Sequence, residues 1–397
     1  MKKISRAGAC LERSMIRLFL EEQERIAKTC DDMISFTVGE PDFIAPPNVA
    51  LACIRAIAEG KTKYAPNAGL SELKEAVSQK MEQIYGKHYD ASTEIVITNS
   101  GMDGLRLTFA AILDEGDEVI VGDPAWSNHP NHPVLAGGKS VRVPLREENN
   151  FTYRIEDLEA AVTDKTRAVL LNSPNNPTGA VIQYEDLLAL CDFVTRHDLY
   201  LVSDEVYYNI IFDGMKFWSP AMIDGMKDRT IIIQSFSKTY AMTGWRLGYV
   251  AGPADLIEAI GKINENSCSC VNTAVQWAGI EALSGEQTQP YLDMMVASFQ
   301  ERRDVVYQMI NEIPGLSCVK PQGAFYAFVN IAGTGMKAAD FATKLLRNYH
   351  VGLVPGTGFG PDCENYVRIS YATSMENICE GIRRIGRFVA DETAKAD

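Results

Sequence analysis

The stretch Arg167-Ala-Val-Leu-Leu171 decides the fold, together with Tyr200-Leu-Val-Ser203 and the segment 185–196 between them. Both short runs are rich in Val and Leu, which is typical of buried strands. Between them, the apolar residues Leu187, Leu190 and Val194 recur at helical spacing. A strand, a helix and a second strand in this order predict a parallel β-α-β unit, because parallel strands need a crossover connection.

Further runs of the same kind extend this pattern. Strand-like runs occur at residues 94–98, 118–121 and 230–234, and residues 104–113 form another amphipathic segment. We therefore expect an α/β fold with a large domain over residues 45–285. Its mostly parallel central sheet should be covered by helices on both faces.

The two chain ends differ from this core. A helical N-terminal segment comes first, and the remaining elements expected outside the core are a strand at 34–38, a helix at 289–313, strands at 324–329 and 366–370, and a last helix from Met375. These elements predict a smaller α+β domain that is assembled from residues 1–44 and 286–397.

Composition excludes several classes of function. The 397 residues include 38 Lys and Arg against 52 Asp and Glu, a formal net charge of −14. Nucleic-acid binding needs a basic face, so no nucleic-acid partner is expected.

No apolar run approaches the ~18 residues of a membrane-spanning helix, and charges from Arg6 to Arg17 interrupt any signal sequence. The nine cysteines are scattered, which indicates reduced thiols and a cytoplasmic protein without a membrane partner.

Three short motifs carry little weight. Gly137-Gly-Lys-Ser140 resembles the end of a phosphate-binding loop, but the first glycine of that loop would fall on Pro133, so a turn is expected. Gly356-Thr-Gly-Phe-Gly360 lies far from any strand that could open a dinucleotide fold, which argues against a nicotinamide cofactor. His129 and His132 are each followed by proline, which argues against a regular helix that presents both to a metal. No metal is expected.

A fourth motif leaves a distant alternative open. Ser235-Phe-Ser-Lys238 matches the S-x-x-K nucleophile motif of serine acyl-enzyme hydrolases of the penicillin-binding type. The companion motifs S-D-N and K-T-G are not matched, since Ser203-Asp-Glu205 and Lys238-Thr-Tyr240 come nearest.

Three polar residues point to a cofactor. Asn176, Asp204 and Lys238 each follow a predicted strand, so they should share the carboxyl-end rim of the sheet, where open α/β folds bind ligands. Partial desolvation and the nearby cation Arg246 would lower the pKa of the lysine amine, which favours a nucleophile that forms Schiff bases. A carboxylate such as Asp204 keeps a pyridine nitrogen protonated, so these residues indicate pyridoxal phosphate.

The segment Ser235-Phe-Ser-Lys-Thr-Tyr-Ala-Met-Thr-Gly-Trp-Arg-Leu-Gly-Tyr249 closely resembles the cofactor-lysine segment of class I/II aminotransferases. These are fold-type-I pyridoxal-phosphate enzymes of the aspartate aminotransferase type. Further segments match in the family's order: Gly39-Glu-Pro-Asp-Phe43, Lys63-Tyr-Ala-Pro-Asn-Ala-Gly-Leu70, Asn175-Asn-Pro-Thr-Gly179, Asp204-Glu-Val-Tyr207 and Val367-Arg-Ile-Ser370. The resemblance implies an enzyme of amino-acid metabolism and biosynthesis that moves the amino group of an L-amino acid to a 2-oxo acid.

The resemblance also implies roles around the cofactor ring. Lys238 would form the Schiff base and then move a proton between the substrate α-carbon and the C4′ carbon of the cofactor. Asp204 would pair with the pyridinium nitrogen, and His129 would support that aspartate from behind without touching the ring. Asn176 and Tyr207 would hydrogen-bond the phenolic oxygen of the ring.

Substrate and phosphate contacts follow from the same resemblance. Trp126 would stack on the ring and, with Gly39 and Asn176, contact the substrate, while Arg368 would grip the α-carboxylate with its two-point fork. Tyr64 would reach the phosphate of the neighbouring subunit, which implies a homodimer. The residues expected around the phosphate in the same subunit are Ser100, Gly101, Met102, Ser235, Ser237 and Arg246.

The donor and the reaction type stay open at this stage. Dicarboxylate-specific relatives carry a cation for the substrate side chain, but the two aligned positions here are Met102 and Asn266. Arg13 or Arg17 could supply a cation from the N-terminal segment instead. The donor could therefore be aspartate, an aromatic amino acid or a broad set, with 2-oxoglutarate as the expected acceptor. A carbon–sulfur lyase on the same fold is the main alternative.

Overall fold

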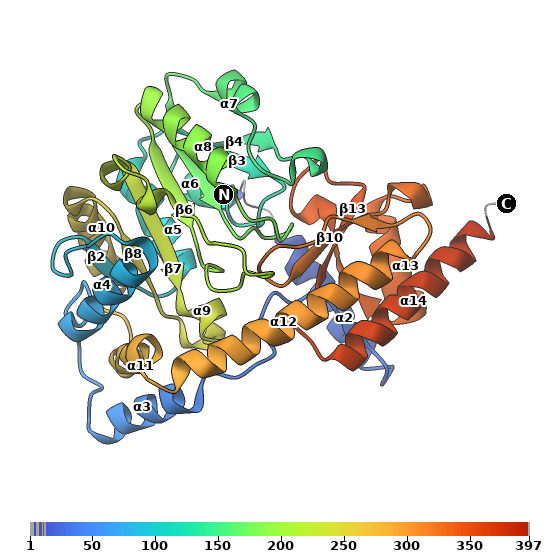
Figure 1. Cartoon of the computed structure of the whole chain (residues 1–397), viewed down its shortest axis with the longest axis horizontal. Coiled ribbons are helices and arrows are strands. Elements are labelled where there is room, and N and C mark those ends of the chain that lie inside the picture. The colour runs from blue at the N-terminus through green and yellow to red at the C-terminus, as the bar shows by residue number, and fades with distance from the viewer. Residues whose placement is uncertain (1–3, 5–7, 10, 12, 396–397) are drawn as a thin grey trace.

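A seven-stranded sheet forms the centre of the computed structural model, which describes residues 4, 8–9, 11 and 13–395 (Figure 1). β8 runs antiparallel to both of its neighbours, and the other neighbouring pairs are parallel. In spatial order the strands are β2 (Ile95–Thr98), β8 (Gly248–Ala251), β7 (Thr230–Ser235), β6 (Tyr200–Asp204), β5 (Thr166–Asn172), β3 (Glu118–Asp123) and β4 (Lys139–Pro144). The prediction of a mostly parallel α/β sheet is confirmed.

Helices cover both faces of this sheet because its central strands are apolar on both sides. Along β7, Ile231 and Ile233 pack beneath α5 (Gly101–Ile112) and α10 (Ala254–Cys268), whereas Ile232 packs on the opposite side. This is the two-residue alternation of a strand. The other helices of this part are α3 (Pro47–Ala58), α4 (Ser71–Tyr85), α6 (Asn131–Leu135), α7 (Ile155–Ala161), α8 (Tyr184–Arg196), α9 (Phe236–Thr239) and α11 (Thr273–Ser284).

Two smaller sheets lie beside the large one, and residues from both chain ends build them. A two-stranded parallel sheet pairs β1 (Ile34–Ser35) with β11 (Val351–Gly352). An antiparallel sheet contains β12 (Val354–Pro355), β13 (Tyr366–Ser370), β10 (Tyr326–Asn330) and β9 (Ser317–Cys318) in that order. The helices packed with them are α2 (Met15–Ala27), α13 (Ala338–Tyr349) and α14 (Met375–Thr393).

One long helix, α12 (Thr288–Asn311), connects the two parts of the molecule. It contacts α11 at one end and α14, β9 and β10 further along, as the diagonal helix in Figure 1 shows. Leu292, Phe299 and Ile310 are buried along its length. The two sets of sheets thus share a continuous apolar core.

The structure corrects some expectations. β4 and β8 were not predicted. A turn was expected over residues 137–140, but Lys139 and Ser140 begin β4. Of these four residues, Gly137 lies in a turn, with φ of +91°. The strand expected at 34–38 is limited to Ile34–Ser35. A short helix, α6, contains His132 and Pro133, but it begins after His129, so no regular helix presents both histidines, as expected. A five-residue helix is short enough to tolerate a proline in its first turn.

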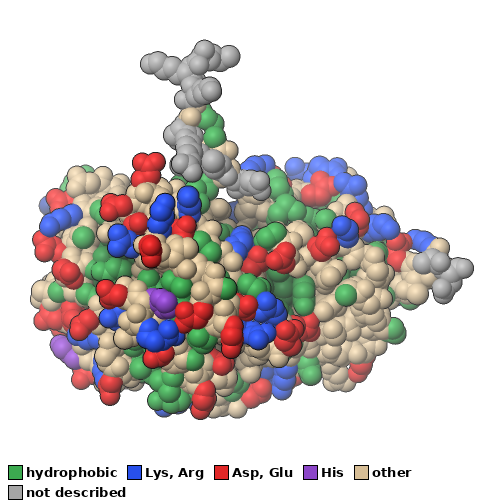
Figure 2. Space-filling view, turned by 90° about the horizontal axis from the view of Figure 1, so that it is seen from above, with side chains coloured by type: hydrophobic (Ala, Val, Ile, Leu, Met, Phe, Trp, Pro, Cys, Tyr) green, Lys and Arg blue, Asp and Glu red, His purple; other side chains and the backbone are tan. Residues whose placement is uncertain are grey.

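The surface mixes charges of both signs. Figure 2 shows acidic and basic side chains interspersed over one face of the molecule. The sequence contains 52 acidic and 38 basic residues, a formal net charge of −14. Within the described part of the chain, no helix is long and apolar enough to cross a membrane.

Candidate active site

A cavity of about 540 Å³ lies between the carboxyl edge of the large sheet, α2 and the antiparallel sheet. Its volume falls within the range of small-molecule sites. It is lined by nearly all the residues singled out in the sequence: Gly39, Ser100, Gly101, Met102, Trp126, His129, Asn176, Asp204, Tyr207, Ser235, Ser237, Lys238, Arg246 and Arg368. Tyr64 is the exception, since it lies outside the cavity and 91% of its surface is exposed.

Three neighbouring strands deliver the polar residues of the cavity floor. β5 ends at Asn172 just before Asn176, β6 ends at Asp204, and β7 ends at Ser235 just before Lys238. Because these strands are parallel neighbours, their carboxyl ends meet at one rim.

A buried carboxylate and an imidazole form one wall of the cavity. The Nε2 atom of His129 lies 2.7 Å from the Oδ2 atom of Asp204, and both side chains are almost fully buried. The amide of Asn172 donates to the backbone oxygen of Asp204 at 3.0 Å. The ring of Trp126 meets His129 edge to face, with centroids 5.2 Å apart. This arrangement holds a carboxylate that can bind a cationic ring nitrogen.

The amine of Lys238 has the properties of a nucleophile. It lies on α9 and donates a hydrogen bond to the backbone oxygen of Gly39. Burial lowers its pKa from 10.5 to about 8; the charges of Arg368 and Arg246 act in the same direction, while those of Glu40 and Asp204 oppose it. A larger fraction of the amine is therefore neutral, and nucleophilic, near neutral pH.

Two helix starts and an arginine lie together in the cavity, an arrangement that suits an anion. Ser100 caps α5 with its hydroxyl oxygen, which accepts from Asp103 N at 3.4 Å. Ser235 caps α9, and Arg246 projects into the same cavity from a left-handed backbone with φ of 57°. Backbone N–H groups at the start of a helix such as α5 favour a phosphate. A Cβ atom at Gly248 would lie 2.6 Å from the carbonyl carbon of Ser100, so only glycine lets β8 pass so close to this site.

Arg368 presents a guanidinium at the opposite side. It lies on β13, and only 1% of its surface is exposed. Its Nη2 donates to the backbone oxygen of Thr37 at 2.6 Å and its Nη1 to Oδ1 of Asn176 at 3.1 Å. Its Nε is buried with no protein partner, and an orphaned donor of this kind indicates room for a ligand acceptor.

Sequence reasoning missed several residues of this site. Tyr326 lines the cavity, and its hydroxyl lies 2.8 Å from that of Tyr207 and its ring 4.6 Å from the Arg368 guanidinium carbon. Asn172 and Thr37 act through their bonds to Asp204 and Arg368. Asn172 ends a predicted strand just as Asp204 does, so the same rule could have found it; Thr37 contributes only a backbone oxygen, which no sequence pattern marks.

Of the four positions considered for substrate selectivity, two line the cavity and two lie outside it. Met102 lines the cavity, whereas Asn266 lies outside it and donates to Lys262 O on its own helix. Arg17 lines the cavity, whereas Arg13 lies outside it and pairs with Glu21.

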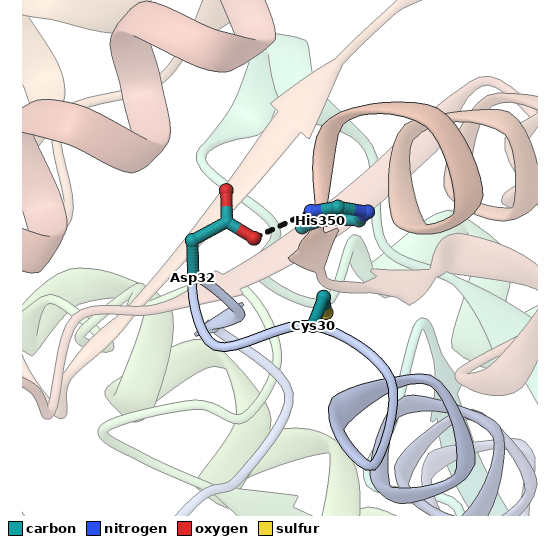
Figure 3. A group of neighbouring side chains, drawn as sticks. All are labelled: Cys30, Asp32 and His350. Carbon is teal, nitrogen blue, oxygen red and sulfur yellow. Dashed lines mark hydrogen bonds and ion pairs between the residues drawn. The ribbon is translucent and has the colours of Figure 1, made fainter.

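Side chains that could ligate a metal occur at two further places. His132 is buried beside Trp126, and burial lowers its pKa to about 4. Figure 3 shows Cys30, Asp32 and His350, the one such cluster among the described residues. Asp32 already lies 2.6 Å from the His350 ring and 3.0 Å from the Arg384 guanidinium, and both partners lower its pKa. This cluster therefore ties the segment before β1 to the start of β11.

Comparison with known proteins agrees with this geometry. Residues 31–385 match the family model of aminotransferase class I and II. The chain is 40% identical over 367 residues to the aspartate aminotransferase of Pyrococcus abyssi, with 92% of this chain and 94% of the relative covered. It is also 40% identical over 367 residues to aromatic-amino-acid aminotransferase 2 of Thermococcus litoralis, with the same coverage. The solved structure of Thermus thermophilus aspartate aminotransferase with maleate matches with a TM-score of 0.92 at 36% identity, covering 98% of this chain and 100% of that one.

The chain thus belongs to the class I and II aminotransferases, enzymes of fold type I. It is an aminotransferase that depends on pyridoxal phosphate. Neither the carbon–sulfur lyase nor the serine hydrolase alternative is favoured. The Ser235 hydroxyl donates to the Leu247 backbone oxygen and the Lys238 amine to Gly39, so they do not form a Ser-Lys pair.

The residues of the cavity fit this cofactor. The Asp204–His129 pair suits a protonated pyridine nitrogen, and Lys238 suits the aldehyde. The start of α5, with Arg246 and with Ser235 and Ser237 at the start of α9, suits a phosphate. The bound cofactor supplies an electron-withdrawing ring that stabilises negative charge at the substrate α-carbon.

Proposed function

We propose that the enzyme transfers the amino group of aspartate, an aromatic amino acid or a broader set of L-amino acids to 2-oxoglutarate. The observation that carries this proposal is the single cavity that holds Asp204–His129, Lys238 and the partly unpaired Arg368 together. The printed names of the relatives, an aspartate and an aromatic-amino-acid aminotransferase, support both donor classes.

Lys238 is the proton carrier of the proposed reaction. Its lowered pKa of about 8 lets the neutral amine take the proton from the substrate α-carbon and return it at the C4′ carbon of the cofactor. Arg368 positions that α-carbon by binding the α-carboxylate. Gly39 lies close to Lys238, because its backbone oxygen accepts a hydrogen bond from the lysine amine before the substrate enters.

Other residues hold the ring. Asp204, backed by His129, keeps the ring nitrogen protonated. Asn176 accepts from Arg368 through its amide oxygen, which leaves its amide nitrogen to donate to the phenolic oxygen beside the Tyr207 hydroxyl. Trp126 packs on the ring face. The residues proposed to bind the phosphate within one subunit are Ser100, Gly101, Met102, Ser235, Ser237 and Arg246.

A homodimer is part of this proposal. α3 exposes Leu51, Ile54 and Ile57 in a row, and the nearby Ile44 is 74% exposed. Such an apolar face is typical of a buried interface. Tyr64 follows α3 on an exposed segment, so it is placed to reach a neighbouring site rather than its own.

Three broader expectations accompany the proposal. The division into a large domain over 45–285 and a small domain from 1–44 and 286–397 is supported by the sheets, since the large sheet uses only residues between 95 and 251. The scattered cysteines support a cytoplasmic location. The relatives' activities support a role in amino-acid biosynthesis.

Two measurements test the proposal. Borohydride reduction followed by peptide mapping should place a pyridoxyl group on Lys238, and an adduct elsewhere would contradict the assignment. Incubation with single amino acids and 2-oxoglutarate should then release glutamate. Release of pyruvate and ammonia without glutamate would indicate elimination instead.

A further inference from the structure

Three side chains that can each ligate a transition metal meet where the two chain ends pair. Cys30 and Asp32 lie between α2 and β1, and His350 lies between α13 and β11. The pairing of β1 with β11 brings them together, and the backbone nitrogen of Ile34 donates to the backbone oxygen of His350 at 2.9 Å. One potential ligand atom from each of the three residues lies within 4.8 Å of the others (Figure 3).

These spacings are close to those around a bound zinc ion. Nitrogen, oxygen and sulfur ligands lie about 2.0–2.3 Å from a tetrahedral zinc ion, so two ligand atoms of one ion are about 3.3–3.7 Å apart. His350 Nδ1 and Asp32 Oδ1 are 2.6 Å apart and would have to separate by about 1 Å. Small rotations suffice for this, because Cys30 and His350 are half-buried and Asp32 is exposed.

Arg384 orients the carboxylate of this group. Its Nη1 lies 3.0 Å from Oδ2 of Asp32, and it donates to the backbone oxygens of Asp32 at 2.8 Å and Tyr349 at 3.2 Å. The arginine therefore holds both segments that carry the group and leaves Oδ1 of Asp32 for an ion. Metal-ligating carboxylates are typically hydrogen-bonded in this way. The positive charge of Arg384 is partly balanced by Glu380 at 3.0 Å.

The types of side chain select zinc among the common divalent cations. Mg²⁺ and Ca²⁺ prefer oxygen ligands, whereas thiolate and imidazole ligands suit Zn²⁺. The thiolate of Cys30 and the carboxylate of Asp32 together balance the two charges of the ion. On binding, the ion replaces the thiol proton of Cys30, which is released to solvent, and the hydrogen bond between His350 and Asp32. Three protein ligands leave a fourth position for water.

We propose that Cys30, Asp32 and His350 bind one zinc ion per subunit, and that this ion fastens the N-terminal segment to the start of β11. The site is separate from the active-site cavity, which none of the three residues lines. The first turns of α2 line that cavity and its last turn leads to Cys30, so the ion fastens the far end of the helix. The expectation of no metal rested on local motifs, which miss ligands such as Asp32 and His350 that are 318 positions apart.

The test measures binding of Zn²⁺ to the holoenzyme, under a phosphine reductant, by competition with a chromophoric chelator. We expect one ion per subunit with a dissociation constant in the micromolar range, and no displacement by Mg²⁺. Cys30→Ser and His350→Asn should each weaken zinc binding at least about 10-fold, because each removes a ligand. Asparagine is chosen at position 350 because it tolerates the φ of 56° found there.

Cys379→Ser and His88→Asn are the matched controls. Cys379 is a half-buried free cysteine like Cys30, His88 is an exposed histidine, and neither belongs to the group. Both controls should bind zinc as the wild type does. Equal affinity in the wild type, Cys30→Ser and His350→Asn would overturn the proposal, because zinc would then bind elsewhere. A wild type that binds no zinc at micromolar concentrations would overturn it as well.

Two further readouts do not depend on how well a variant folds. Co²⁺ in place of zinc should give the wild type the visible absorption of a thiolate–cobalt complex, at longer wavelengths than the cofactor absorbs, and Cys30→Ser should lose it. In the wild type, zinc should slow amide hydrogen exchange in β1 and β11 and leave α10 unchanged. Cobalt absorption that persists in Cys30→Ser, or exchange in β1 and β11 that zinc does not slow, would overturn the proposal.

Discussion

Replacement of Lys238 by methionine should stabilise the cofactor-free protein at neutral pH. The site lowers the pKa of this amine from 10.5 to about 8, chiefly by burial. Each pKa unit corresponds to about 1.4 kcal/mol, so the folded state disfavours the charged amine by at most about 3 kcal/mol. Lys238→Met removes this penalty but also removes the hydrogen bond to Gly39, which contributes about 1 kcal/mol. The net gain in the free energy of unfolding at pH 7 should be about 2 kcal/mol.

The sign of the pH dependence makes this prediction specific. Below pH 8 the amine is charged in both the folded and the unfolded state, so the wild type carries the full penalty. Between about 8 and 10.5 the folded state loses its proton first, and the wild type becomes relatively more stable. Above 10.5 the advantage of Lys238→Met should vanish.

The assay is urea unfolding of both proteins without cofactor at about pH 7 and about pH 10, monitored by fluorescence. Lys262→Met is the matched control, because Lys262 is exposed and pairs only with Glu258 on the surface. It should show no pH-dependent difference. A Lys238→Met protein that is less stable than the wild type at pH 7, by an amount independent of pH, would refute the reasoning.

Further predictions concern binding and packing. Arg368→Lys should raise KM and lower kcat, with at least a ~10-fold loss in kcat/KM, because a lysine cannot hold Thr37 O and a carboxylate with the same two-point geometry; unchanged steady-state kinetics would contradict its assignment. Tyr64→Phe should weaken cofactor affinity about 5-fold or more while sedimentation still reports a dimer, and full affinity would exclude the tyrosine from the neighbouring site. His129→Phe should lower kcat by about 10-fold, since the partner of a buried carboxylate is lost; the same rate in stopped-flow turnover would count against a supporting role. Gly360→Ala should lower the melting temperature, because a Cβ atom there would lie 1.4 Å from Asp123 Oδ1, and an unchanged thermal scan would show that this carboxylate moves freely.

The sequence predicts the central sheet well because its strands are apolar on both faces. Runs such as Thr230–Ser235 are too apolar for surface segments, and the helices between them have clear periodicity. β4 was missed because it is an edge strand with exposed polar residues. β8 was missed because its first two residues, Gly248 and Tyr249, belong to the cofactor-lysine segment and no long helix separates it from β7.

Some residues of the candidate site can likewise be predicted from the sequence, and others cannot. Residues whose chemistry is unusual at a strand end, such as Asp204 and Lys238, can be found from sequence. Tyr326 looks like an ordinary core aromatic of a strand, and its contact with Tyr207 depends on how the two sheets pack. Arg17 could be named but not separated from Arg13, because only the packing of α2 decides which of the two enters the cavity.

The pairing of the two chain ends affects how the protein is made. β1 pairs with β11, and the backbone oxygen of Thr37 accepts a hydrogen bond from Arg368. The N-terminal segment can therefore make these contacts only after the C-terminal elements have been synthesised. The large sheet is complete at Ala251 and can form earlier. A chain interrupted before Arg368 would hold the residues expected around the cofactor ring but lack the arginine proposed to bind the substrate α-carboxylate.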